Sequence, residues 1–308
     1  MTLLAITGAT GFVGSAVLAA ALDAGHQVRA LTRRPQGAMD GVTWVAGDLA
    51  DTAALANLVA GADAVIHVAG LTNTPDPAEF EAANVTGTAN VIAAMKAAGT
   101  RRLVFVSSLA SRMPALSAYG ASKARAEALA EASGGSGTLD WTIIRPPAVY
   151  GPRDIDMLDL FRAAKWGVVP LPPGGATSII HADDLADLLV ALTGNAAPTK
   201  KQIYEPDDGR EGGWSHKELA QAIGQAVGKR SVLAPHLPRT VLDAAAAADR
   251  LLRGDRAKLT PDRVSYMSHP NWVSRSDRRV PPGIWQPRIA GLEGLKATAE
   301  WYRRAGWL

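Results

Sequence analysis

The chain has 308 residues, of which 47% are hydrophobic and 20% are charged, and this balance is typical of a globular protein with a sizeable core. The formal net charge is only +3 and the lysines and arginines are scattered along the chain, which argues against a nucleic-acid partner. The absence of cysteine excludes disulfides and thiolate metal sites and is compatible with a reducing compartment.

The first residues, MTLLAITGATGFVG, have no basic region before their apolar stretch and no small-residue cleavage site after it. We therefore interpret them as a buried strand and not as a signal peptide. The longest run of small apolar residues, 244–248, lies between Asp243 and Asp249 and is too short to span a bilayer. Together these features predict a cytoplasmic protein without a membrane partner.

Short apolar runs alternate with helix-length segments through the first half of the chain. Continuous apolar runs suit strands that are buried on both faces, and helices such as Ser15–Ala24 and Val85–Ala98 supply the crossovers between them. The pattern predicts an α/β fold of the Rossmann type, with a doubly wound parallel sheet. The predicted strands are Leu3–Thr7, Gln27–Thr32, Thr43–Ala46, Ala64–Val68, Leu103–Ser107 and Trp141–Ile144.

After about Gly151 the sequence becomes richer in proline and glycine, which favours loops between isolated helices. We predict that residues 1–165 form a Rossmann domain. Residues 166–308 are predicted to form a smaller, mostly helical substrate-binding part, which can interleave with the first part. Its predicted helices are Ser215–Val227, Thr240–Arg253 and Leu292–Ala305.

The segment TGATGFVG places three glycines between the first predicted strand and the first predicted helix. Without side chains the turn can tighten and its backbone can approach a pyrophosphate, whose charge is favoured by the helix N-terminus. A glycine triplet alone is weak evidence, but the strand before it and the helix after it predict a nucleotide site. The predicted cofactor contacts of this turn are Gly8, Thr10, Gly11, Phe12, Val13 and Gly14.

The residues about 20 positions further along indicate which dinucleotide binds. An acidic side chain there would bind the ribose 2′-hydroxyl of NAD, but this sequence has Thr32-Arg33-Arg34. Guanidinium groups match a 2′-phosphate in charge and in hydrogen-bond geometry, so we predict NADP(H) in preference to NAD(H). The alternative is that Arg33 and Arg34 are merely solvated at a strand end.

Two further strand ends are predicted to contact the cofactor. Asp48-Leu49 follow the third strand, where Asp48 either accepts a hydrogen bond from the adenine amino group or caps a turn. Val68-Ala69-Gly70 end the fourth strand with small residues that leave room for a ribose. His67, beside them, is interpreted as a structural histidine and not as a base or metal ligand.

A tyrosine and a lysine four residues apart, Tyr119 and Lys123, share one face of a predicted helix. A neighbouring ammonium favours phenolate, so we expect the pKa of Tyr119 to be lowered, which suits proton exchange with a substrate oxygen. Ser107-Ser108 end the preceding strand, at the edge where open α/β sheets bind ligands. We choose Ser108 to orient a substrate carbonyl, although serines also cap helices.

These blocks together resemble the extended short-chain dehydrogenases/reductases, the group that includes the NAD-dependent epimerases and dehydratases. The similarity runs over residues 1–190, and the remainder of the chain matches only loosely. The matching blocks are TGATGFVG at 7–14, GDL at 47–49, HVAG at 67–70, NVTGTAN at 84–90, SS at 107–108, YGASK at 119–123, RPPAVYGP at 145–152 and HADDLA at 181–186.

The resemblance implies further roles for single residues. Asn84 would support a water-linked proton relay, although it could equally cap the following helix. Asp183-Asp184 open a helical pattern, where carboxylates favour the helix dipole, so we assign them a structural role and predict no metal. A homodimer is one assembly that the resemblance implies. The remaining predicted cofactor contacts are Ser107, Tyr119, Lys123, Pro146 and Val149.

The predicted reaction is reversible hydride transfer between NADP(H) and the carbonyl or alcohol of a small, fairly apolar substrate, with Tyr119 as acid or base. Sugar-nucleotide epimerases usually carry an arginine before the HADDLA-like block, but residues 174–180 contain no cation. An epimerase or dehydratase acting on a sugar nucleotide and a non-catalytic NADP(H)-binding sensor or assembly protein are the alternatives. The predicted substrate contacts are the apolar residues Met113, Met157 and Phe161.

Overall fold

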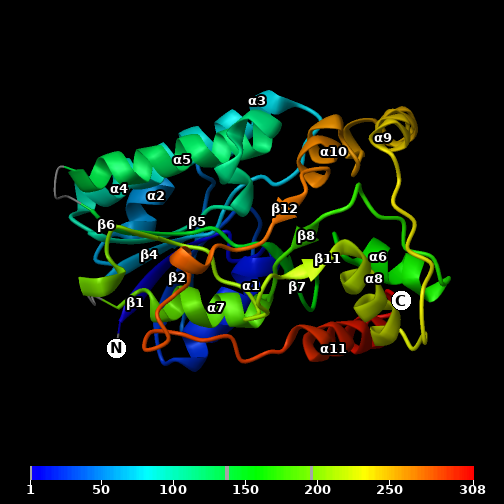
Figure 1. Cartoon of the computed structure of the whole chain (residues 1–308). Helices are drawn as coiled ribbons and strands as arrows, with labels where there is room; N and C mark the ends of the chain where they lie inside the picture. Colours follow the sequence, from blue (N-terminus) through cyan, green and yellow to red (C-terminus); the bar gives the residue numbers. More distant parts are fainter. Residues whose placement is uncertain (1, 136–138, 195–196) are drawn as a thin grey trace.

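The computed structural model describes residues 2–135, 139–194 and 197–308, and these ranges form one seven-stranded sheet with helices on both faces (Figure 1). The strand order is β10-β6-β5-β4-β1-β2-β3, and each neighbouring pair is parallel. The strands are β1 (Leu3–Thr7), β2 (Gln27–Thr32), β3 (Val42–Ala46), β4 (Ala64–His67), β5 (Arg102–Val106), β6 (Asp140–Ile144) and β10 (Gln202–Tyr204).

The Rossmann-type fold predicted from the sequence is confirmed. Each of the six predicted strands is present, and no end differs from its prediction by more than one residue. The order β3-β2-β1-β4-β5-β6 reverses direction between β1 and β4, which creates the crevice where such sheets bind dinucleotides. The additional edge strand β10 comes from the second half of the chain and pairs with β6.

The helices bury the two faces of the sheet separately. In β1, Leu4 and Ile6 point to the face covered by α1 (Phe12–Asp23) and α7 (Ala182–Ala191), whereas Ala5 points to the opposite face. That second face is covered by helices on the upper side of Figure 1. They are α2 (Thr52–Val59), α4 (Gly87–Ala98) and α5 (Ala118–Gly135).

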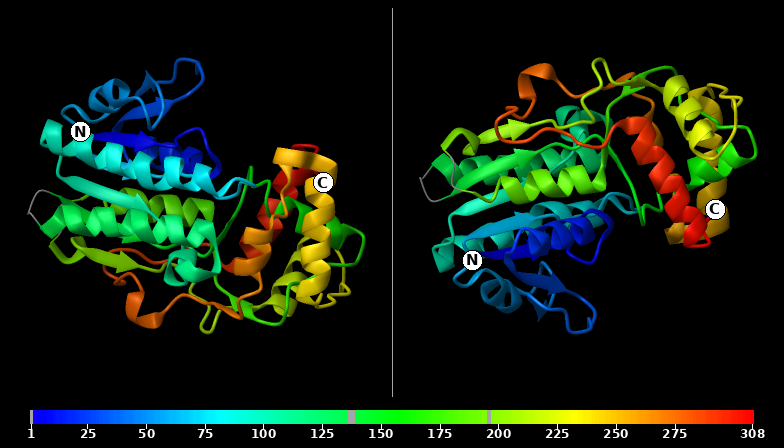
Figure 2. Two further views of the ribbon diagram at one scale, coloured as in Figure 1. Left: turned by 90° about the horizontal axis from the view of Figure 1, so that it is seen from above. Right: turned by 90° about the horizontal axis from the view of Figure 1, so that it is seen from below.

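The rest of the chain forms a smaller, mostly helical part beside the sheet (Figure 2). Its helices are α6 (Leu158–Lys165), α8 (His216–Ala226), α9 (Arg239–Arg253), α10 (Pro261–Met267) and α11 (Gly291–Arg304). Its strands are β7 (Ala148–Tyr150) paired with β9 (Ile179–His181), and β8 (Ala176–Thr177) between β11 (Trp214–Ser215) and β12 (Asn271–Trp272). Short elements are α3 (Pro77–Phe80), the π-helical turn Glu81–Thr86 and 3₁₀ turns at Leu109–Arg112, Pro114–Leu116, Ala197–Thr199, Gly254–Arg256 and Ser276–Arg278.

Within the described ranges, no helix is both long enough and apolar enough to cross a bilayer.

A separate apolar core holds the smaller part together. Phe161 of α6 is fully buried in this core and meets the ring of Tyr302 edge-on, with 5.2 Å between the ring centroids. Tyr302 of α11 in turn donates a hydrogen bond to the carbonyl of Asp154 over 2.7 Å. These contacts fix α6 against α11.

We predict that Phe161→Ala lowers the free energy of unfolding by about 3–5 kcal/mol, because it leaves a cavity in a close-packed core. Urea unfolding of the full chain measures this change. Trp166→Ala is the matched control, since Trp166 is 87% exposed and its removal should change the free energy by less than about 0.5 kcal/mol. A loss of similar size in both variants would contradict the placement of Phe161 in the core.

Candidate active site

A cavity of about 1200 Å³ opens at the carboxyl ends of the central strands. It is bounded by the glycine turn after β1, by the ends of β2, β4 and β5, and by the first turns of α5. Every residue predicted to contact the cofactor lines it. These residues are Gly8, Thr10, Gly11, Phe12, Val13, Gly14, Arg33, Arg34, Asp48, Leu49, Val68, Ala69, Gly70, Ser107, Tyr119, Lys123, Pro146 and Val149.

The glycine turn leaves no room for side chains. Gly8 has a φ of +77°, and a Cβ there would lie 2.7 Å from the backbone nitrogen of Ala69. A Cβ on Gly14 would lie 1.9 Å from the carbonyl oxygen of Gly8. Gly11, the N-cap of α1, supplies no side-chain hydrogen bond, so the first N–H groups of the helix stay available to a ligand. The turn therefore fits the pyrophosphate of a dinucleotide.

The two arginines after β2 lie on the cavity wall and are exposed. The hydroxyl of Thr32 donates to the carbonyl of Arg34 over 2.7 Å, which fixes the turn that carries both guanidinium groups. Among the described residues, none forms an ion pair with Arg33 or Arg34. Two cations without an acidic partner can therefore bind an anionic group of a ligand in the cavity.

Asp48 both lines the cavity and stabilises a turn. Its carboxylate accepts hydrogen bonds from the backbone nitrogens of Ala50 at 2.8 Å and Asp51 at 3.2 Å. The capping role that the sequence left open is therefore present, and the same side chain also faces the space where an adenine would lie.

Ser108, Tyr119 and Lys123 all line the cavity. Tyr119 is buried in the first turn of α5, and its phenol is hydrogen-bonded with the side chain of Ser108. The Lys123 ammonium donates to the carbonyl of Val106 over 3.0 Å and lies 5.5 Å from the centre of the Phe105 ring. Ser108 also caps the following 3₁₀ turn, so both of its predicted roles are compatible with the structure.

The first turn of α5 is held by a residue from the distant helix α10. The carboxylate of Asp262 accepts hydrogen bonds from the backbone nitrogens of Ala118 at 2.5 Å and Tyr119 at 3.3 Å. An anionic cap at a helix N-terminus satisfies free N–H groups and complements the helix dipole. Tyr119 is thereby fixed at the point where it faces the cavity.

The pKa of Tyr119 differs from the sequence-based expectation. Burial raises it above its ordinary value, and Tyr266 and Asp156 raise it further, while the hydrogen bond with Ser108 opposes them. The expected lowering by Lys123 is therefore wrong, because the removal of the phenolate from water outweighs the opposing contribution, which comes from Ser108. Tyr119 is therefore a protonated acid at neutral pH, which suits it to donate a proton.

Lys123 has the opposite shift. Burial lowers the pKa of its ammonium to about 8, and the Glu127 carboxylate one helical turn away opposes this fall. The side chain stays charged at neutral pH and loses its proton as the pH rises through about 8.

Asn84 lies in the π-helical turn and does not cap a helix. Its Nδ2 donates to the carbonyl of Leu71 and to the hydroxyl of Ser122, both over 2.9 Å, and its Oδ1 accepts from the Leu71 nitrogen over 2.7 Å. The capping alternative is therefore wrong. A Cβ on Gly70 would lie 2.9 Å from Asn84 Oδ1 and 3.0 Å from Lys123 Nζ, so amide and ammonium approach the same point beside the cavity. π-Helical turns are common at functional sites.

An ionic network that the sequence analysis missed supports the end of β5. Glu127 accepts hydrogen bonds from the hydroxyls of Ser107 and Ser111 and from both ends of the Arg145 guanidinium. Arg145 also lies 3.6 Å from Glu205, just after β10. The signal in the sequence is the spacing of four from Lys123 to Glu127, which places the carboxylate one turn below the ammonium.

Two other polar residues of the matching blocks are structural. Both ring nitrogens of His67 are hydrogen-bonded to threonine hydroxyls, Thr7 at 2.7 Å and Thr88 at 3.0 Å, and burial lowers the pKa of His67 to about 3. Asp184 accepts hydrogen bonds from the backbone nitrogens of Arg288 and Ile289. Within the described ranges, no group of three or more His, Cys, Asp or Glu side chains could hold a metal.

The three predicted substrate contacts do not reach the described cavity wall. Met157 and Phe161 are buried in the core of the smaller part, and Met113 is 41% exposed away from the wall. The physical reason is that the apolar face of α6 turns inward to Tyr302. Beyond the predicted cofactor contacts, the wall includes Leu71, Thr72, Glu79, Ala82, Ala83, Pro147, Asp154 and Asp156.

Two of these wall residues are acidic and come from the segment before α6. Burial raises the pKa of Asp154 to about 7, and its carboxylate accepts a hydrogen bond from the Asp156 nitrogen over 2.8 Å. Asp156 forms an ion pair with Arg263 of α10 at 3.2 Å. No motif in the sequence distinguished these residues from an ordinary loop.

The glycine turn, the crevice at the strand-order reversal and the buried Ser-Tyr-Lys group define a Rossmann-type enzyme that binds a nicotinamide dinucleotide. Residues 4–205 match the family model described as the NAD dependent epimerase/dehydratase family. The chain therefore belongs to this family.

Several named proteins are similar to this chain over nearly its whole length. The ceramide reductase of Caulobacter vibrioides is 34% identical over 99% of this chain and 95% of its own length. The 2-alkyl-3-oxoalkanoate reductase of Stenotrophomonas maltophilia is 31% identical over 94% of this chain and 96% of its own length. The fold is similar to that of MoeE5, solved in complex with UDP-glucose and NAD, with a TM-score of 0.76, 23% identity and 99% of both chains covered. The family match and the relatives named as reductases together support the interpretation that this chain is an NAD(P)-dependent enzyme of the oxidoreductase or epimerase type.

Proposed function

We propose that the protein is an NADP(H)-dependent reductase that interconverts a carbonyl and an alcohol on a substrate with an apolar chain. The observation that carries this proposal is that Ser108, Tyr119 and Lys123 line the same cavity as the glycine turn. Two full-length relatives named as reductases support the reaction type. Both of their names describe substrates with alkyl chains, which supports the substrate class.

The chemistry at the carbonyl needs one hydride and one proton. When bound, the reduced nicotinamide supplies the hydride to the carbonyl carbon. Tyr119 gives its phenolic proton to the carbonyl oxygen, so that one C–H bond and one O–H bond form as the C=O double bond is reduced. Ser108 donates a hydrogen bond to the same oxygen and stabilises the charge that develops there.

Lys123 and Asn84 support this proton transfer. The ammonium, charged at neutral pH, stabilises the phenolate that remains after transfer, and its place beside Gly70 suits it to hold the ribose of the cofactor. The amide of Asn84 approaches the same point and can order water between Lys123 and solvent. In this proposal the proton lost by Tyr119 is replaced through that water.

The cofactor preference rests on Arg33 and Arg34. Both line the adenosine end of the cavity and are exposed there without an acidic partner among the described residues. A 2′-phosphate would supply the missing anion, whereas NAD(H) would leave both guanidinium groups in water.

The charge on the substrate side disfavours a sugar nucleotide. Of the described residues that line the cavity beyond the cofactor contacts, Glu79, Asp154 and Asp156 are acidic and none is a cation. A diphosphate would meet these carboxylates without a compensating arginine. Arg162 of α6 does not line the cavity and donates hydrogen bonds to the carbonyl of Trp307. We therefore place the reductase ahead of the epimerase.

We predict that Tyr119→Phe lowers kcat for reduction of a long-chain ketone with NADPH by about 10²–10⁴-fold, because the proton donor is lost. NADPH oxidation measures turnover, and fluorescence titration measures cofactor affinity, which should not change. Tyr204→Phe is the matched control, since its hydroxyl bonds the carbonyl of Pro198 away from the cavity. Full turnover in Tyr119→Phe would refute the assigned role.

We predict that the double variant Arg33→Ala, Arg34→Ala raises the Kd for NADPH by about tenfold or more per arginine, because charge-assisted hydrogen bonds to the phosphate are lost. The Kd for NADH should change little, so the ratio of the two constants approaches one. Isothermal titration calorimetry measures both. Arg304→Ala, an exposed arginine in the last turn of α11, is the control. An equal loss of affinity for both cofactors would contradict phosphate binding.

A further inference from the structure

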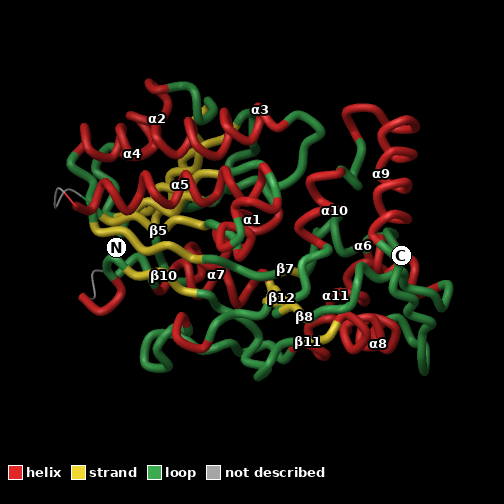
Figure 3. The backbone as a smooth tube through the Cα atoms, turned by 45° about the horizontal axis from the view of Figure 1, so that its top comes forward, coloured by secondary structure: helices red, strands yellow, loops and turns green. Residues whose placement is uncertain are grey.

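Helix α9 turns its apolar side away from the protein. Of its described residues, Arg239–Arg253, only Ala246 is buried. Leu251 and Leu252 are 88% and 83% exposed, and Val241 is 46% exposed. Figure 3 shows the helix at the outer edge of the molecule. A surface helix of a globular protein normally places such residues against the core.

The helical period shows that the exposed apolar residues share one side. At 100° per residue, Val241, Ala245, Ala248 and Leu252 form one row, and the row of Ala244, Ala247 and Leu251 lies beside it. The opposite row contains Leu242, Ala246, Asp249 and Arg253. This row faces the protein, because Ala246 is buried and Asp249 accepts hydrogen bonds from the backbone nitrogens of Lys258 at 2.8 Å and Leu259 at 2.9 Å.

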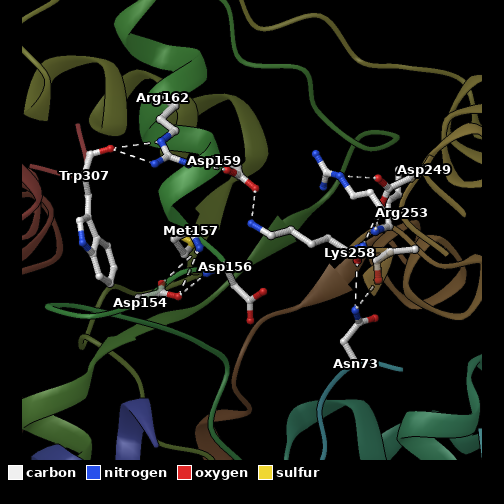
Figure 4. A network of polar contacts seen from close by, with 12 residues as sticks. Asn73, Asp154, Asp156, Met157, Asp159, Arg162, Asp249, Arg253, Lys258 and Trp307 are labelled. Carbon is white, nitrogen blue, oxygen red and sulfur yellow. Dashed lines mark hydrogen bonds and ion pairs between the residues drawn. The ribbon is translucent and has the colours of Figure 1, made fainter. Parts of the chain in front are cut away.

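The segment that holds α9 is joined by polar contacts to the loop after β4 and to the segment before α6 (Figure 4). Asn73, in the loop after β4, donates to the carbonyls of Ala257 at 3.2 Å and Lys258 at 3.3 Å. Lys258 also forms an ion pair with Asp159 of α6 at 2.9 Å. A few residues further along, Arg263 pairs with Asp156 on the cavity wall. A surface that binds α9 would therefore lie near the substrate side of the cavity.

The charge of this region is opposite to that of an anionic surface. Residues 229–258 contain seven lysines or arginines and three aspartates, a net charge of +4 in a chain whose total is +3. Residues 259–308 also carry a net charge of +4 and residues 1–228 carry −5, so the positive charge lies in the last 80 residues of the chain, which include α9. Trp166, 87% exposed, follows α6, and tryptophan is favoured at membrane–water interfaces.

We propose that the apolar face of α9 docks on the surface of a lipid bilayer with anionic headgroups, from which the enzyme takes its substrate. Exposed leucines would enter the boundary between headgroups and acyl chains, and the flanking cations would contact the phosphates. The proposal rests on the proposed function, since an apolar-chain substrate partitions into a bilayer. It revises the expectation of no membrane partner: the outward orientation of α9 is visible only in the folded chain.

The test is flotation of the full chain with vesicles in the absence of substrate. The protein should float with vesicles of phosphatidylcholine and phosphatidylglycerol, and less with phosphatidylcholine alone or at high salt. Leu251→Ser together with Leu252→Ser should lower the bound fraction by about tenfold or more, because two buried leucines are lost. Met39→Ser, which removes an apolar residue that is 48% exposed between β2 and β3, is the matched control and should float like the unmodified protein.

Three results would overturn the proposal: no flotation of the unmodified protein, equal flotation of the leucine variant, or a dimer without vesicles that the leucine variant dissociates. The last result would make this face a contact between two copies of the chain. The proposed reductase activity is tested separately on a short-chain, water-soluble ketone without vesicles. The leucine variant should retain that activity, so failure of docking and failure of the proposed function are distinguishable.

Discussion

A buried ammonium at the carboxyl end of β5 is the constraint around which the site is arranged. Removing a charge from water is costly unless other groups replace the lost hydration. The Lys123 ammonium donates a hydrogen bond to the carbonyl of Val106 at the end of β5 and lies over the face of the Phe105 ring. Close approach of the ammonium also explains why Gly70 carries no side chain, since a Cβ there would lie 3.0 Å from Nζ. The Asn84 amide oxygen lies as close to the same point, at 2.9 Å.

The same constraint extends into the packing around α5. Glu127, one turn after the lysine, places a negative charge in the interior near the ammonium. Its carboxylate accepts hydrogen bonds from two serine hydroxyls and from Arg145. Arg145 connects this network to Glu205 beyond the edge strand β10. At the other end of α5, Asp262 fixes the turn that carries Tyr119. Residues from three distant parts of the sequence therefore hold the acid and the ammonium at fixed positions, which is the preorganisation that proton transfer requires.

Local spacing was sufficient to predict the sheet and the cofactor side of the cavity. The glycine turn, the two arginines after β2 and the pair Tyr119 and Lys123 depend on positions close in sequence, and the fold brings them together as expected. Phe161 was misplaced because an amphipathic helix can turn its apolar face to a core or to a cavity, and only packing against Tyr302 decides between them. The sequence predicts a lowered pKa for Tyr119, whereas the structure raises it. The sequence could not show this, because the shift depends on burial and on Tyr266 of α10 and Asp156 before α6, which are distant in the chain. The division at residue 165 stays a prediction, since α7 and β10 lie in the layers of the sheet.

The most direct test of the arrangement is the pKa of Lys123 in the cofactor-free protein. A ¹³C NMR titration of the lysine Cε signals measures it, with the Lys123 signal assigned by its loss in Lys123→Met. The account predicts a pKa of about 8, because burial disfavours the charged form even with Glu127 nearby. A signal that titrates near the ordinary lysine value of about 10.4 would contradict it, because the ammonium would then lie in water and not in the interior beside the end of β5.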